Sequence, residues 1–454
     1  MAYDLLIKDG NVVLPDGVRK IDIGISKGRI AAIGDSLNEP SASILHAEGL
    51  TIFPGAIDVH VHFDEPGRTE WEGFETGSSM LAAGGCTSYF DMPLNGIPST
   101  VSRQALTDKV KIAEAESHVD FALWGGLVPG NISDLAEMHE AGAIGFKAFL
   151  SPSGNAEFEA VDDLSLLAGM RQIASLGAIL ALHAESAPIV TFLQKEKEEK
   201  GLTGFNDYLA SRPIVAEVEA VSRALLFARL TGCKLHFVHI SSTEAVALIQ
   251  QAKAQGQDVT LETCAHYLLY SHEDFCRLGV IGKCAPPLRP ETERVNLVHA
   301  LIDGKIDMVS SDHSPCTWEE KDKDNLFAAW GGISGGQFTL LSVIELALSY
   351  HLPLSRVAEW TAASPARRFQ LAPEKGGIQI EADADLVLVD LNAPYTVSSE
   401  KLFQKNKFTL YKGHTFPASV RTTISRGRVV YTDGEIMGRT EGQWLRPHGI
   451  IAAH

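Results

Sequence analysis

Residues 55–63 read GAIDVHVHF, a short apolar strand that ends in two histidines. Side chains two residues apart in a strand point to the same side, so His60 and His62 can reach one metal ion. Seven further segments of the same kind follow, each apolar or β-branched and each entering a polar or Gly/Pro-rich stretch. They are residues 85–93, 119–127, 142–150, 177–185, 233–241, 258–269 and 305–314. Helical intervals such as 216–232 separate them, which predicts an α/β fold with eight βα units closed into a (β/α)8 TIM barrel.

The two ends of the chain have a different texture, with short alternating strands and turn dipeptides such as Asp9-Gly10. Strand-like stretches return late in the chain, as ADLVLVDL and TTISRGRVVYTDGEIMG. A chain of 454 residues has room for a large barrel and a smaller domain. We therefore expect both ends to pair into one small β-sandwich domain. The expected division is residues 1–52 and 372–454 for that domain and 53–371 for the catalytic barrel.

Charge and composition exclude several classes of protein. Asp and Glu number 57 against 39 Lys and Arg, and the net charge of −18 disfavours nucleic acid and anionic membrane surfaces as partners. We expect no membrane span, because no run of eighteen apolar residues occurs, and no secretion signal, because the start lacks a basic leader. The six cysteines lie far apart without a Cys-x-x-Cys motif, which favours the reducing cytoplasm.

Acid and base side chains recur at the ends of four further predicted strands, as Lys147, His183, His239 and Asp312. Active sites of (β/α)8 barrels lie at the carboxyl ends of the strands. A His-x-His pair by itself could be two structural histidines, and any one strand-end residue could simply be hydrogen-bonded. Five strands that deliver such groups to one rim favour a shared catalytic centre.

Lys147 is the most informative of these residues. Its neighbours in GFKAFL are apolar, and a bare ammonium would be costly among them. A buried lysine loses its proton readily, and a neutral amine can add CO2 to form an anionic carbamate that bridges two metal ions. The alternative is a lysine whose ammonium reaches solvent from the strand end.

These residues resemble the cyclic amidohydrolases, a family that comprises allantoinases, dihydroorotases, dihydropyrimidinases and hydantoinases. The likeness extends over essentially the whole chain and implies two divalent metal ions. It assigns one ion to His60 and His62, the bridge to carboxylated Lys147, the second ion to His183 and His239, and the roles of ligand and general base to Asp312. Zinc is the expected metal, while cobalt, manganese and iron suit the same ligands.

Within the family, HFDEPGRTEWEGFETG, KCAPPLR, SSDHSPC and AWGGISGG are most similar to allantoinases. That resemblance implies hydrolysis of allantoin to allantoate and assembly as a homotetramer. Dihydroorotases carry an Arg two residues after the His-x-His pair to bind the substrate carboxylate, and this chain has Asp64 there. We expect the acid to repel that carboxylate.

Substrate contacts are expected from backbone groups near Ala285 and Gly331 and from Asn95, by analogy with relatives, although Asn95 and Gly331 could equally be turn formers. One alternative activity is that of a hydantoinase or dihydropyrimidinase acting on other cyclic ureides. A distant alternative is a non-catalytic scaffold of the same fold. Such scaffolds lack the metal ligands, whereas this chain has the full set.

Overall fold

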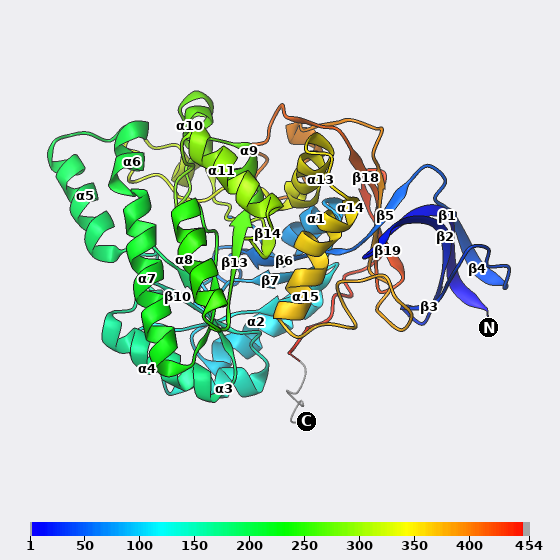
Figure 1. The fold of residues 1–454 in the computed structure, drawn as a ribbon, viewed down its shortest axis with the longest axis horizontal. Helices are drawn as coiled ribbons and strands as arrows, with labels where there is room; N and C mark the ends of the chain where they lie inside the picture. The colour runs from blue at the N-terminus through cyan, green and yellow to red at the C-terminus, as the bar shows by residue number, and fades with distance from the viewer. Residues whose placement is uncertain (1, 448–454) are drawn as a thin grey trace.

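The computed structural model describes residues 2–447, and within them eight parallel strands form the predicted barrel (Figure 1). The strands are β6 (Ala56–Val61), β7 (Cys86–Asp91), β8 (Asp120–Leu123), β10 (Phe146–Phe149), β11 (Ile179–His183), β12 (Lys234–Phe237), β13 (Val259–Cys264) and β14 (Met308–Ser310). Each lies inside one of the segments expected from the sequence. The ring closes where the His62 N–H donates to the His313 carbonyl at 2.8 Å. This confirms the predicted fold.

Helices on the outside of the barrel cover these strands (Figure 1). The longer ones are α1 (Phe74–Ala83), α2 (Arg103–Glu116), α3 (Asp134–Ala141), α4 (Asp163–Ser175), α5 (Ala187–Glu199), α7 (Ile214–Thr231), α8 (Thr243–Ala254), α11 (Glu291–Ile302) and α13 (Thr339–Ser349). The shorter ones are α6 (Phe205–Ser211), α9 (Ala265–Leu269), α10 (His272–Leu278), α12 (Trp318–Lys321), α14 (Leu354–Ala358) and α15 (Ser364–Arg368).

Local sequence explains where the outer helices begin and end. The Ser242 side chain caps α8 by accepting from the Ala245 N–H, and Asp162 caps α4 by accepting from the Ser165 N–H at 2.7 Å. Helix α7 ends at Gly232, whose φ of 73° is a conformation that glycine adopts at no steric cost. Among residues 2–447, no helix has both the length and the apolar character needed to cross a bilayer.

Strands from both chain ends form one nine-stranded sheet beside the barrel, as expected (Figure 1). Its strands are β1 (Tyr3–Leu14), β2 (Gly17–Ser26), β3 (Arg29–Gly34), β4 (Ser41–His46), β5 (Thr51–Pro54), β15 (Leu386–Asp390), β18 (Ser419–Ser425), β19 (Arg428–Thr432) and β20 (Glu435–Ile436). The two ends meet where β5 pairs antiparallel with β15, with Ile52 opposite Leu388. Strand β5 continues to Pro54, past the boundary expected after residue 52. Residues 448–454 of the expected C-terminal part lie outside the described residues.

A buried ionic cluster fastens this sheet to the barrel. The Lys375 ammonium lies 2.6 Å from Asp120 of β8, 3.0 Å from Asp383 and 2.5 Å from Asp385. Arg426 binds Asp120 as well, at 2.7 Å. Burial lowers the pKa of Lys375, but the three carboxylates outweigh it and the net shift is upward. The cation thus neutralises a group of carboxylates between the two parts of the molecule, which holds them in register.

Candidate active site

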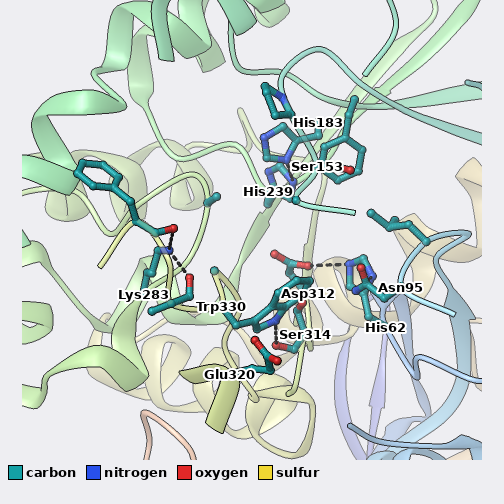
Figure 2. A pocket seen from close by; sticks show the side chains of 18 of the residues that line it. His62, Asn95, Ser153, His183, His239, Lys283, Asp312, Ser314, Glu320 and Trp330 are labelled. Atoms are coloured by element: carbon teal, nitrogen blue, oxygen red, sulfur yellow. Dashed lines mark hydrogen bonds and ion pairs between the residues drawn. The ribbon is translucent and has the colours of Figure 1, made fainter. Parts of the chain in front are cut away.

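A cavity of about 490 Å³ opens at the carboxyl ends of the barrel strands (Figure 2). Eight of the nine residues expected in the site line it: His60, His62, Asn95, His183, His239, Ala285, Asp312 and Gly331. The ninth, Lys147, lies beneath the others and is 0% exposed. The structure therefore brings together groups that five separate strands contribute.

The imidazole and carboxylate groups point toward one another. Asp312 Oδ1 lies 3.2 Å from His60 Nε2 and 3.3 Å from His62 Nε2. On the other side of the cluster, His183 Nδ1 lies 3.0 Å from His239 Nε2 (Figure 2). Ligand atoms of His60, His239 and Asp312 all lie within 4.8 Å of one another, a spacing that suits a metal ion.

Backbone conformation helps to aim two of these side chains. His239 and Asp312 each follow the end of a strand and have positive φ values of 38° and 43°. Residues other than glycine rarely adopt this conformation, and it is concentrated at functional sites. Both side chains line the cavity from these turns.

The Lys147 amine is suited to modification rather than to a charged structural role. Its Nζ has no hydrogen-bond partner among residues 2–447. Burial lowers the pKa of Lys147 to about 8, against the opposing effects of Asp312 and Glu262. A buried ammonium without a hydrogen-bond partner is costly, so burial favours the neutral amine, which is the form that can react with CO2. Together with the imidazoles and Asp312, it forms a donor set suited to divalent ions.

Two buried carboxylates that the sequence reasoning missed orient the histidines. Glu262 of β13 lies 2.6 Å from His60 Nδ1 and also contacts His236 at 3.1 Å. Glu185 lies 2.8 Å from His183 Nε2 and is paired with Arg212. In each histidine the other ring nitrogen faces the cluster, which is the usual arrangement behind a metal-ligating histidine. Their signal in the sequence was an acid inside an apolar strand (LETC) and an acid two residues after His183.

The environments of the two carboxylates differ. Burial raises the pKa of Glu262 to about 8. Burial also acts on Glu185, but Arg212 and His183 outweigh it and lower the pKa of that carboxyl to about 2. The surroundings of Glu185 thus favour its charged form, which holds the His183 ring, while burial disfavours the charged form of Glu262 beside His60 and His236.

Replacing Glu262 with alanine should weaken metal binding by roughly 10- to 100-fold, the usual effect of losing such a supporting group. His60 would lose the acceptor that fixes its ring orientation. The metal affinity of Glu262→Gln should lie between those of Glu262→Ala and the parent, because the amide oxygen can still accept from the His60 Nδ1–H. Titration with a competing chelator measures the affinities. Unchanged affinity in a folded Glu262→Ala protein would contradict this role.

The three candidate substrate contacts differ in what they touch. Asn95 is 1% exposed, and its amide nitrogen lies 3.3 Å from His62 Nδ1, so it supports His62 as well as facing the cavity. Its φ of 78° also places it in a turn. A side chain on Gly331 would come within 3.9 Å of Ala285, so these two residues stand close together on one wall.

The structure corrects the expected position of Asp64, while the expected indifference to dihydroorotate stays a prediction. The side chain is 1% exposed and lies outside the set that lines the cavity among residues 2–447. Burial, with Asp91 and Glu72 nearby, raises the pKa of the Asp64 carboxyl well above its usual range. The burial of Asp64 therefore argues against the expected contact between its carboxylate and a substrate.

Comparison with known proteins places this geometry among enzymes. Residues 51–430 match the model of the amidohydrolase family. The chain is 54% identical to an allantoinase of Bacillus velezensis over 99% of both chains. It is 46% identical to an allantoinase of Deinococcus radiodurans, over 99% of this chain and 100% of that one. Among solved structures, an L-hydantoinase (dihydropyrimidinase) from Arthrobacter aurescens has a TM-score of 0.95 at 33% identity, covering 98% of this chain and 100% of that chain.

Proposed function

Because the chain belongs to the amidohydrolase family, we propose that it hydrolyses the ring amide of allantoin to give allantoate. The observation that carries this proposal is the 54% identity to an allantoinase along 99% of the chain. Other allantoinases at 41% to 50% identity support it. The cavity at the carboxyl ends of the barrel strands, with its convergent histidines and Asp312, is the site that such a reaction needs.

We assign two divalent ions to this site. His60 and His62 would hold one, His183 and His239 the other, and Lys147 as a carbamate would lie between them. The unpaired Lys147 amine and the ring nitrogens facing one another support this assignment. Divalent ions lower the pKa of a coordinated water to about 7 and polarise a carbonyl oxygen, which is the chemistry that opening an unactivated amide requires.

Asp312 is the group placed to move the proton. Its carboxylate faces both His60 and His62 and lines the cavity, so it can take a proton from the attacking water and deliver it to the departing ring nitrogen. Glu262 and Glu185 keep the rings of His60 and His183 in position during this transfer. Backbone groups at Ala285 and Gly331 would orient the hydantoin ring, with Asn95 beside His62.

Zinc, assembly as a homotetramer and a cytoplasmic location complete the proposal. The mixed imidazole and carboxylate donors support zinc without excluding cobalt, manganese or iron. The six cysteines are free, which supports a reducing compartment. We also propose that residues 53–371 carry the catalysis and that residues 1–52 and 372–454 form the attached β domain.

Product analysis tests the proposed activity. Enzyme reconstituted with zinc should convert allantoin to allantoate, with a kcat/KM for allantoin at least ~10-fold above those for hydantoin and dihydrouracil. The alternative, a hydantoinase or dihydropyrimidinase, is favoured by the solved structures of that class that share this fold. A preference for hydantoin or dihydrouracil over allantoin would replace our assignment with that one. Protein without metal and without turnover on all three would favour a scaffold.

A further inference from the structure

One wall of the cavity is a segment without regular structure that lies between α12 and the 3-10 turn at Gly336–Phe338. Residues Phe327, Ala328, Ala329, Trp330 and Gly331 of this segment all line the cavity. A segment without helix or strand bonding needs other partners for its carbonyl groups. Here two buried lysine side chains supply them.

Lys321, at the end of α12, is the first of these lysines, and it is 1% exposed. Its Nζ donates to the Trp330 carbonyl at 3.0 Å and to the Gly332 carbonyl at 2.5 Å. These two carbonyls flank Gly331 on either side. The same Nζ donates to the Lys283 carbonyl at 3.0 Å, two residues before Ala285. A single side chain thus fixes the backbone next to both candidate substrate contacts.

Lys283 holds the earlier part of the segment. Its Nζ donates to the Ala329 carbonyl and to the Phe327 carbonyl, the latter at 3.4 Å (Figure 2). The Nζ also lies 4.9 Å from the centre of the Tyr208 ring on α6. Tyr208 in turn donates from its hydroxyl to the Cys284 carbonyl at 2.8 Å. The two carbonyl groups that precede Ala285, those of Lys283 and Cys284, are therefore bound by Lys321 and Tyr208.

Neither lysine has a carboxylate within ion-pair distance among residues 2–447, although both are buried. Burial lowers the pKa of Lys321 to about 8 and the pKa of Lys283 to about 6. A buried amine with only carbonyl partners is an expensive way to stabilise a fold, because an apolar side chain would avoid the desolvation penalty. The role of the two lysines is therefore sought in the backbone position that their bonds to carbonyl groups impose.

We propose that Lys321 and Lys283 are positioning residues that hold the backbone at Gly331 and Ala285 against the substrate ring. This inference rests on the proposed function and extends it to two residues outside the proposed set of metal ligands. Five carbonyl contacts from two buried side chains leave the segment little freedom. Gly332 adds to the constraint, because a Cβ there would lie 2.3 Å from the Ser314 carbonyl oxygen.

The test is a comparison of Lys321→Met, Lys283→Met and Lys323→Met. Methionine keeps most of the side-chain length and removes the donors. Lys323 is exposed on the same segment and makes no side-chain contact of this kind, so its variant is the matched control. We expect KM for allantoin to rise about 10-fold or more in the first two variants, while kcat and metal content stay close to the parent. Lys323→Met should keep the parent KM.

Hydrogen exchange of residues 326–332 gives a readout that is independent of turnover. The amide hydrogens of this segment should exchange faster in Lys321→Met and Lys283→Met than in Lys323→Met. Should Lys321→Met fail to fold, KM and hydrogen exchange of Lys283→Met test the inference instead. Parent-like KM and parent-like exchange in a folded variant would overturn the inference. A parent enzyme that does not hydrolyse allantoin would instead overturn the proposed function, and the exchange measurement would still test the backbone contacts.

Discussion

Lys147→Ala should lose both metal ions and essentially all ring-opening activity. The expected loss is well beyond the roughly 10- to 100-fold that removal of a supporting residue causes in metal sites. Two divalent ions a few ångströms apart repel strongly unless an anion lies between them. Lys147 of β10 is buried beside β11, which ends at His183, and its amine has no hydrogen-bond partner among residues 2–447. The alanine variant cannot form a carbamate. Metal analysis and turnover with allantoin measure both effects.

Short carboxylic acids provide the control for this prediction. Acetate or propionate should restore part of the metal content and activity of Lys147→Ala by filling the vacated position. Lys147→Leu also lacks the amine but leaves no space, so the same acids should not rescue it. Reconstitution of metal-free parent enzyme should be slower when bicarbonate is removed. An unmodified Lys147 in fully active, metal-loaded enzyme would refute the carbamate.

Asp312→Asn should reduce kcat by about 100-fold or more, the usual scale for loss of a general acid-base group. Its amide cannot accept and return a proton, yet its oxygen can still face His60 and His62 at nearly the same distances. We therefore expect much of the metal to remain bound. Steady-state kinetics together with metal analysis on the same preparation check the prediction.

Histidine variants provide the comparison for Asp312→Asn. Alanine at His60, His62, His183 or His239 should lower both metal content and activity without unfolding the protein, because a ligand is lost in each case. In Asp312→Asn, by contrast, activity should fall while most of the metal content is retained. Near-normal turnover in Asp312→Asn would mean that another group moves the proton.

The barrel could be predicted because its signal is local and repeated. Each predicted segment contains the strand that the structure has there, since an apolar run bounded by polar residues is the form of a strand buried on both faces. The convergence of His60, His183 and Asp312 followed from strand order alone, because parallel strands bring their carboxyl ends to one rim. The assignment of metal ions to these groups remains a prediction.

What could not be predicted depends on where a single side chain points. Glu262 looked like an ordinary strand residue, and only the register of β13 beside β12 brings it to His60 and His236. Asp64 is expected to face the substrate, but its side chain is buried and lies outside the set that lines the cavity among residues 2–447. Lys321 and Lys283 gave no signal, because their partners are backbone carbonyls of a segment with no regular structure.

The pairing of β5 with β15 affects how the chain must be synthesised. Strand β5 leaves the ribosome early and pairs with β1 on one side, while its other edge waits for residues 386–390. At ordinary rates of translation, that wait lasts about 15 to 70 s. Throughout it, an apolar strand edge that includes Ile52 and Phe53 stays open to pairing with other nascent chains. Any product that terminates inside the barrel keeps this edge exposed permanently, so aggregation of prematurely terminated chains should begin at the N-terminal strands.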